Sequence, residues 1–169
     1  MAETKNTLVK RSDKVAYFGI GSADASTHTR MKGFTDMSTS KNPSEYSRRY
    51  VDEAFEQTDV TGYSPSISYG FDQYLGNEVH EDIVDITDNE KLGSDAVRSI
   101  VIVDFSKPVE GKGYEAKKRD FAVIPDSEGG SNDAYTYSGS FRSKGDVIHG
   151  TATVEGDVAT FTETAEAAE

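Results

Sequence analysis

The chain contains no cysteine among its 169 residues. Without a thiol it can form no disulfide, no thiolate metal site and no cysteine nucleophile. We therefore expect the fold to rest on a hydrophobic core, and this length is sufficient for one domain with one such core. The sequence predicts that this domain spans residues 14–163. The polar residues 1–13 are expected to form a flexible arm, and the acidic residues 164–169 a frayed tail.

Long hydrophobic runs are absent as well. No stretch approaches the roughly 18 apolar residues of a membrane-spanning helix. The first fourteen residues, MAETKNTLVKRSDK, are polar and lack the apolar segment of a secretory signal. We expect a soluble protein that is made inside the cell and does not bind membranes.

Positive charge is scarce. Eighteen Lys and Arg stand against 30 Asp and Glu, which gives a net charge of −12. Proteins that grip nucleic acid do so by neutralising phosphates with Lys and Arg, and anionic membranes attract basic surfaces. The charge balance therefore argues against general binding to either.

No group of side chains forms a recognisable catalytic or metal-binding pattern. The three histidines, His28, His80 and His149, have no partners at the spacing that converging metal ligands need. The Asp52–Glu53 pair lies among other charged residues, whereas a glycosidase acid needs an apolar pocket to raise its pKa. The glycine-containing stretch Gly19–Asp24 lacks the lysine of a phosphate-binding loop. We expect no enzyme activity, no metal and no cofactor.

Alternating apolar residues predict a mainly β fold. Ile67, Tyr69 and Phe71 alternate with polar residues, as in a strand with one buried face. Arg98–Phe105 is nearly continuously apolar, which is typical of a central strand covered on both faces. Further strands are expected at 14–21, 114–125, 135–142, 147–154 and 158–162, and the total of about seven or eight strands shows no alternation with helices. The pattern indicates a β-sandwich or small barrel.

One helix is expected, at about 77–92. Val79, Ile83 and Ile86 form a single apolar stripe at helical spacing. Asn77 is a suitable N-cap, and Gly93 is expected to end the helix. The acidic side chains on the remaining surface of this helix, Asp82 among them, are expected to face solvent. The helix should flank the β domain.

A long projecting β-hairpin is expected at about 45–73. We predict a first strand at 45–57, a turn at 58–65 that contains Gly62 and Pro65, and a second strand at 66–73. Both faces of the first strand carry charge, so it cannot lie in a dry core. An isolated hairpin is marginally stable, and its unpaired edges are templates for other chains. We therefore expect copies of the protein to pair through this hairpin.

Four segments in this order resemble a known family. They are TSKNPSEYSRRYVDE (Thr39–Glu53), TDVTGYSPSISYGFD (Thr58–Asp72), NEVHEDIVDIT (Asn77–Thr87) and RSIVIVDF (Arg98–Phe105). Together they resemble the tail tube, or major tail, proteins of long-tailed phages and prophages of Gram-positive bacteria. Two later segments, FAVIPDSEGG (Phe121–Gly130) and GSFRSKGD (Gly139–Asp146), fit the same pattern, so the resemblance extends over nearly the whole chain.

The resemblance implies a structural, non-enzymatic subunit made in the bacterial host cytoplasm and incorporated into the phage tail. Six copies would close into a ring, their hairpins would join into a shared barrel, and the rings would stack into a tube. Partners would be other copies, the tape measure protein, and the tail terminator and distal tail proteins. Phage DNA would pass through the lumen without specific binding, because a negative wall repels phosphates.

The resemblance also assigns residues to the shared barrel and to the charge of its lumen. The barrel candidates are Tyr46, Arg48, Arg49, Tyr50, Val51, Phe55, Ile67, Tyr69 and Phe71. The candidates for lumen charge are Asp52, Glu53, Glu56 and Asp59. A shift of one residue in strand register would exchange the two faces of the hairpin, so the inward face stays open.

Two alternatives remain at this point. The chain could be a monomeric β-sandwich binding or capsid-decoration module, for which an exposed aromatic platform is expected. Nine tyrosines are present for such a platform, but no tryptophan. The chain could also be the inner tube of a contractile tail or injection system, since the sequence has no feature that separates the two kinds of tube.

Overall fold

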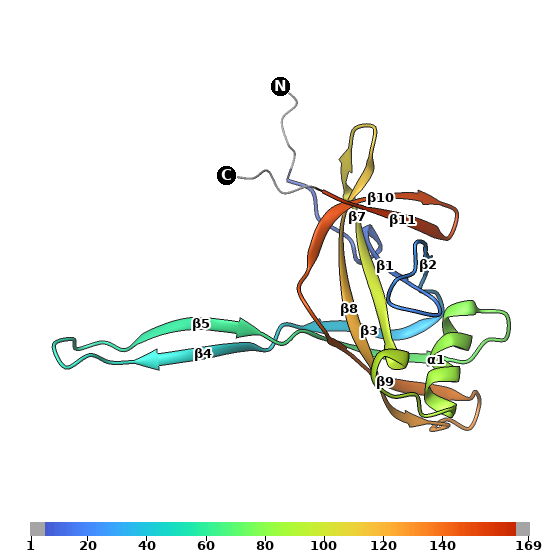
Figure 1. Ribbon diagram of the computed structural model, residues 1–169, viewed down its shortest axis with the longest axis horizontal. Helices are drawn as coiled ribbons and strands as arrows, with labels where there is room; N and C mark the ends of the chain where they lie inside the picture. Colours follow the sequence, from blue (N-terminus) through green and yellow to red (C-terminus); the bar gives the residue numbers. More distant parts are fainter. Residues whose placement is uncertain (1–5, 165–169) are drawn as a thin grey trace.

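A closed β-barrel of six strands forms one half of the domain (Figure 1). The computed structural model describes residues 6–164, so the ends of the expected arm and tail, 1–5 and 165–169, lie outside the described residues. Around the barrel the strands follow the order β10 (Ile148–Glu155), β11 (Val158–Glu163), β2 (His28–Arg30), β1 (Lys14–Phe18), β7 (Val97–Val109) and β8 (Gly113–Glu128). β8 pairs with β10 and closes the ring. A short 3-10 helix, η1 (Arg11–Asp13), precedes β1.

An open sheet forms the other half. The first part of β8, Tyr114–Lys118, pairs with β10, whereas Phe121–Glu128 pairs with β9 (Thr136–Ser143). β9 pairs in turn with β6 (Ser66–Asp72), and β6 with the edge strand β3 (Phe34–Ser40). The helix α1 (Glu78–Asp88) covers this sheet (Figure 1). The expected mainly β fold with a small barrel and one helix is confirmed.

Each half has its own core, and β7 contributes to both. Val101 and Val103 point into the barrel, where they pack with Tyr17 and three alanines. Ile100 packs on the opposite side, in the core between the open sheet and the apolar stripe of α1. The first five residues of β7 are all buried. The expectation of a central strand covered on both faces is therefore confirmed.

The helix α1 begins as expected but ends earlier. The side chain of Asn77 accepts a hydrogen bond from the backbone N–H of His80 at 3.3 Å and caps the N-terminus. The helix stops at Asp88, not near residue 92, because Glu90 adopts a positive φ of 49° and the backbone N–H of Lys91 donates to the carbonyl of Ile86 at 3.1 Å. This is a capping arrangement usually built on glycine. Gly93, the expected end of α1, instead begins the 3-10 helix η2 (Gly93–Ala96).

The projecting hairpin is present, but its strands pair differently from the prediction. β4 (Pro43–Arg48) pairs with β5 (Gln57–Tyr63) in a separate two-stranded sheet that extends away from the domain (Figure 1). The turn lies at 49–56, and most of the predicted turn at 58–65 is strand β5. The predicted second strand is β6, whose buried alternate residues hold it in the open sheet. Gly62 lies beside a bulge in the ladder, and Pro65 connects β5 to β6.

Candidate self-assembly surface

The hairpin β4–β5 has no core of its own. Every residue of β4 is exposed, as is every residue of β5 except the half-buried Gly62. The strand register places Glu45 opposite Val60 on one face, and Tyr46 opposite Asp59 on the other. The side-chain hydrogen bonds within the hairpin join only near neighbours on the same face, such as Ser47 with Thr58 and Arg48 with Tyr46. A hairpin of this kind gains little stability from its own contacts.

The two faces of the hairpin differ in chemistry. The face that carries Val60 also carries Tyr63 and the Ser47–Thr58 pair, whose hydroxyl oxygens are 3.0 Å apart. On the other face, the Arg48 guanidinium donates to the Tyr46 hydroxyl at 2.9 Å, with Asp59 next to it in the ladder. The first face is the more apolar, and the second carries more polar and charged groups.

The tip of the hairpin, residues 49–56, combines exposed apolar and acidic side chains. Val51 is fully exposed and Phe55 is 84% exposed. Asp52, Glu53 and Glu56 lie between and beside them, against a single arginine, Arg49. Large exposed apolar side chains that are surrounded by polar residues are typical of an interaction surface. Three of the four predicted lumen carboxylates therefore lie in the turn, and Asp59 lies on a strand.

The predicted barrel residues fall into two groups. Tyr46, Arg48, Arg49, Tyr50, Val51 and Phe55 all belong to the hairpin, and the Arg48 guanidinium lies 5.8 Å from the centre of the Tyr50 ring. Ile67, Tyr69 and Phe71 lie in β6 and are buried in the core of their own domain. The structure thus brings the first group together and separates it from the second.

The base of the hairpin is closed by Asn42, which the sequence did not single out. Asn42 has a positive φ of 45°, and its side-chain amide donates to the carbonyl of Ser64 at 3.1 Å and to the Ser66 hydroxyl at 3.2 Å. The backbone N–H of Ser64 donates to the carbonyl of Asn42 at 3.3 Å. These bonds join the two ends of the hairpin where it leaves the domain. The signal in the sequence is an asparagine, one of the few residues that tolerate this conformation.

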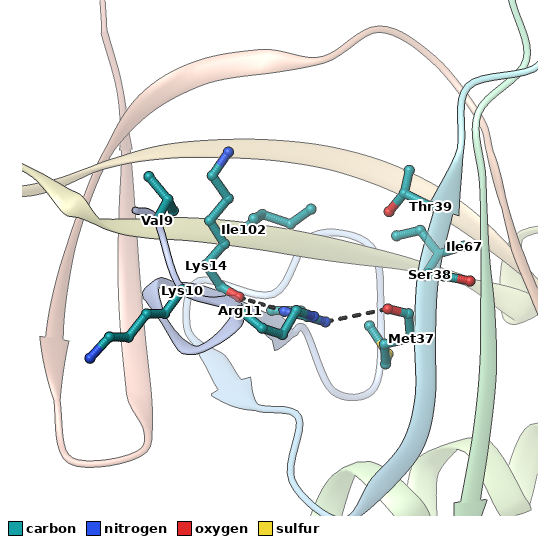
Figure 2. A pocket seen from close by; sticks show the side chains of 10 residues that line it. Val9, Lys10, Arg11, Lys14, Met37, Ser38, Thr39, Ile67 and Ile102 are labelled. Carbon is teal, nitrogen blue, oxygen red and sulfur yellow. Dashed lines mark hydrogen bonds between the residues drawn. The ribbon is translucent and has the colours of Figure 1, made fainter. Parts of the chain in front are cut away.

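A groove with basic walls lies beside the edge strand β3 (Figure 2). We call it the Arg11 groove. It has a volume of about 510 Å³, and an adjoining hollow of about 480 Å³ shares Arg11 and Lys14 with it. The Arg11 guanidinium donates to the carbonyls of Lys14 at 2.8 Å and Met37 at 3.3 Å, and so joins η1 to β3. The sequence predicted a flexible arm over residues 1–13 and did not reveal this groove.

Two histidines are buried. His28 in β2 places Nε2 2.8 Å from the Ser99 hydroxyl, and burial together with the nearby charge of Lys118 lowers the pKa of His28 to about 4. His80 stacks on Phe71 with the ring centres 4.2 Å apart, and burial lowers its pKa too. Within residues 6–164, no three His, Asp or Glu side chains lie close enough to hold a metal ion. In the same residues, no helix is long and apolar enough to cross a membrane.

Comparison with known proteins finds likeness only among solved structures. No protein-family model matches the chain, and no curated protein is significantly similar to it in sequence. A chain in the cryo-EM structure of the anti-feeding prophage cap, the cap that terminates its tube, is 14% identical with a TM-score of 0.48, covering 90% of this chain and 100% of that one. A chain of the anti-feeding prophage baseplate is 10% identical with a TM-score of 0.49, over 85% and 95%. A chain of the sheath–tube complex of an extracellular contractile injection system is 15% identical with a TM-score of 0.48, over 87% and 94%.

Proposed function

We propose that this protein is a structural subunit of a phage-tail-like tube, in which copies join through the hairpin β4–β5. The observation that carries the proposal is a fully formed hairpin that extends from the domain with both faces and its tip in solvent. Such an element costs conformational entropy and exposes two strand edges. A neighbouring copy that covers those faces and pairs with those edges would offset both costs.

Closure into a ring follows from the geometry of such pairing. In the described part of the chain β4 pairs only with β5, so one edge of each strand is open to the next copy. Head-to-tail pairing of this kind closes into a ring when the rotation between copies permits it, and closure leaves no free edge. Six copies per ring, with the rings stacked into a tube, is the arrangement that the resemblance in sequence implies.

The proposed ring places the apolar face of the hairpin outward and the polar face toward the lumen. Val60 and Tyr63 would then pack on the outer layer of the ring, while Arg48 and Asp59 would line the channel. Each copy carries a net charge of −12. The Arg48 and Asp59 charges on this face balance each other, so the repulsion of phosphates that would let DNA pass without adhering comes from the negative charge of each copy as a whole. The tape measure protein and the terminator and distal tail proteins are the further partners of this proposal.

Negative-stain electron microscopy of the purified protein at high concentration tests the proposal. We expect hollow tubes or six-fold rings from the natural chain. A variant that lacks residues 43–63, with Asn42 joined to Ser64 through an Asn-Gly turn, should stay folded, because the ends are already bonded to each other. A deletion of residues 45–73 would not serve, since it removes β6 from the core.

The deletion variant should melt cooperatively and remain a monomer. Circular dichroism and a thermal melt check its fold, and sedimentation velocity checks its size. Tubes from the deletion variant would contradict the role of the hairpin. A natural chain that stays monomeric at every concentration, and behaves like the deletion variant, would favour the binding-module alternative instead.

A further inference from the structure

The charged side chains that line the Arg11 groove all have the same sign. Lys10, Arg11 and Lys14 line the main hollow, and Arg30 joins Arg11 and Lys14 in the adjoining one. Among the described residues no carboxylate lines either hollow, although the chain as a whole carries 30 acidic residues. The groove is therefore a local positive site on an acidic molecule, which favours an acidic occupant.

The floor of the groove is apolar. Met37 and Ile67, from the open sheet, and Ile102, from the barrel, line it (Figure 2). Ala16 of the barrel lines it as well. β3 forms one wall with Met37, Ser38 and Thr39, and in the described part of the chain it pairs only with β6; the carbonyl of Met37 accepts from Arg11. Two carboxylates near these cations are already engaged: Asp13 accepts a hydrogen bond from the backbone N–H of Lys10, and Asp104 accepts from the backbone N–H and the hydroxyl of Ser106. An occupant therefore needs apolar side chains for the floor and carboxylates for the basic walls.

The hairpin tip has this composition. Val51 and Phe55 are the two most exposed of its apolar residues. Asp52, Glu53 and Glu56 lie within one or two residues of them. The tip is the counterpart of the groove in charge and in apolar character.

The tip cannot enter the groove of its own chain. The nine residues from Pro43 to Val51 span about 30 Å when extended, and the hairpin points away from the domain (Figure 1). The base of the hairpin lies next to the groove, since Thr39 in β3 lines the groove and Pro43 begins β4. A tip that enters the groove must therefore belong to another copy.

We propose that the tip of one copy, residues 49–56, docks in the Arg11 groove of a second copy. Val51 and Phe55 contact the floor at Ala16, Met37 and Ile102, which are only partly buried. Asp52, Glu53 and Glu56 lie opposite Lys10, Arg11 and Lys14. This inference rests on the proposed function and deepens it, because it specifies which surfaces of two neighbouring subunits meet.

Disulfide trapping tests the contact directly, since the chain contains no cysteine that could react in its place. The tip variant Phe55→Cys is mixed with the groove variant Thr39→Cys under mild oxidation at high protein concentration. We expect a disulfide between the two variants, identified by mass spectrometry of the linked peptides. The matched control mixes Phe55→Cys with Leu92→Cys, which is 82% exposed outside the groove and should give at least tenfold less of the mixed product.

Charge exchange provides the second test. Arg11→Glu/Lys14→Glu and Asp52→Lys/Glu53→Lys should each raise the concentration needed for assembly at least tenfold. A chain with all four changes should recover to within a few fold of the natural protein. The control Lys112→Glu/Lys144→Glu changes the net charge as the groove variant does, at exposed sites elsewhere, and should assemble normally. Circular dichroism confirms that each variant is folded.

The outcomes separate this inference from the proposed function. Tubes without the Phe55–Thr39 disulfide, or groove variants that assemble like the control, would overturn the docking and leave the tube subunit intact. The disulfide without tubes or rings would support the docking and contradict the tube. Equal trapping at Thr39 and Leu92 would also overturn the docking, since it would show random collision.

Discussion

His28 is buried in the wall of the barrel with one ring nitrogen bonded to Ser99. Its pKa of about 4 lies below the ordinary value of 6.5, mainly because burial disfavours the imidazolium. The unfolded chain therefore binds a proton at this site before the folded chain does. The stabilisation from neutral His28 is complete above about pH 6.5 and is lost as the pH falls toward 4.

We expect the free energy of unfolding to fall by about 2 kcal/mol between pH 7.5 and 5 from this group. His28→Gln removes the titration and should flatten that dependence, leaving a smaller slope from His80, whose pKa is also lowered by burial. Urea unfolding at pH 7.5, 6 and 5 measures the pH dependence of the free energy of unfolding in the natural chain and in the variant. The control His149→Gln changes an exposed histidine and should keep the natural slope. Equal slopes for all three chains would show that His28 is not the titrating group.

Gly113 and Gly21 have nearly the same backbone conformation in different surroundings. Their φ values are +90° and +89°, so alanine is strained at both. At Gly113 a Cβ would lie 2.1 Å from the carbonyl oxygen of Ala152, whereas at Gly21 it would meet nothing within 4 Å. Gly21→Ala should cost about 1–2 kcal/mol of conformational strain. Gly113→Ala should cost at least about 2 kcal/mol more, because β8 must move away from β10. Thermal melts of the two variants compare the costs, and equal losses would refute the steric argument.

A buried ion pair joins the helix α1 to the strand β7. Arg98 in β7 is 2% exposed, and its Nε and Nη2 donate to the two carboxylate oxygens of Asp82 at 2.8 and 3.3 Å. Nη1 donates to the carbonyls of Asp95 and Val97, each at 2.9 Å. The sequence placed Asp82 on a solvated acidic face. That expectation is wrong for this residue, because its partner lies sixteen positions away and helical spacing contains no information about it.

Asp82→Asn should lower the free energy of unfolding by about 3–5 kcal/mol, since it leaves a buried guanidinium without its counter-charge. Arg98→Met in the same chain should recover part of that loss. The control Asp85→Asn, which is also in α1, removes a solvent-exposed ion pair with Lys91 and should change stability little. Urea unfolding of the four chains measures these differences. If Asp82→Asn destabilised the protein no more than Asp85→Asn, the stabilising role of the Asp82–Arg98 pair would be contradicted.

Local sequence patterns predict most of the strands, but they do not predict which two strands pair in the hairpin. The alternation of Ile67, Tyr69 and Phe71 predicts a half-buried strand, and β6 is one. The same alternation cannot distinguish a face buried in the domain from a face buried against a neighbouring copy, and for this reason the pattern alone also fits a hairpin strand. Residues 49–56 resemble a strand because of Tyr50, Val51 and Phe55, although they form the turn. Apolar residues at an interface and in a strand are alike in composition, and only the tertiary fold separates them.

The Arg11 groove could not be predicted for a related reason. Lys10, Arg11 and Lys14 are close in sequence, but the floor beneath them comes from strands on both halves of the molecule. Closure of the barrel through β8 and β10 is equally a long-range property. The sequence therefore predicts the mainly β class, the position of α1 and the presence of a projecting hairpin. The surfaces proposed to meet between copies depend on contacts between distant segments.

Assembly should change the dynamics of the hairpin more than those of the domain. The exposed ladder β4–β5 has no packed side, so its amides should exchange rapidly with solvent in the free chain. In the proposed tube the same amides should be protected at least tenfold. The amides of β7 at residues 97–103, which are buried in both cores, provide the control and should exchange slowly in both states. Hydrogen exchange with mass spectrometry measures both, and equally strong protection of the hairpin in the free chain would contradict this coupling.

The division of β8 between two partners has a mechanical consequence. Its first part is bonded to β10 in the barrel, and its second part to β9 in the open sheet. A pull on the hairpin acts along β6, which pairs with β9 over seven residues, and the load passes through β9 into β8. When force acts parallel to two paired strands, the hydrogen bonds between them must break together. When force separates the strands from one end, the bonds can open one at a time. Tension between subunits would therefore be distributed over the whole open sheet. It would reach the barrel through the continuous strand β8.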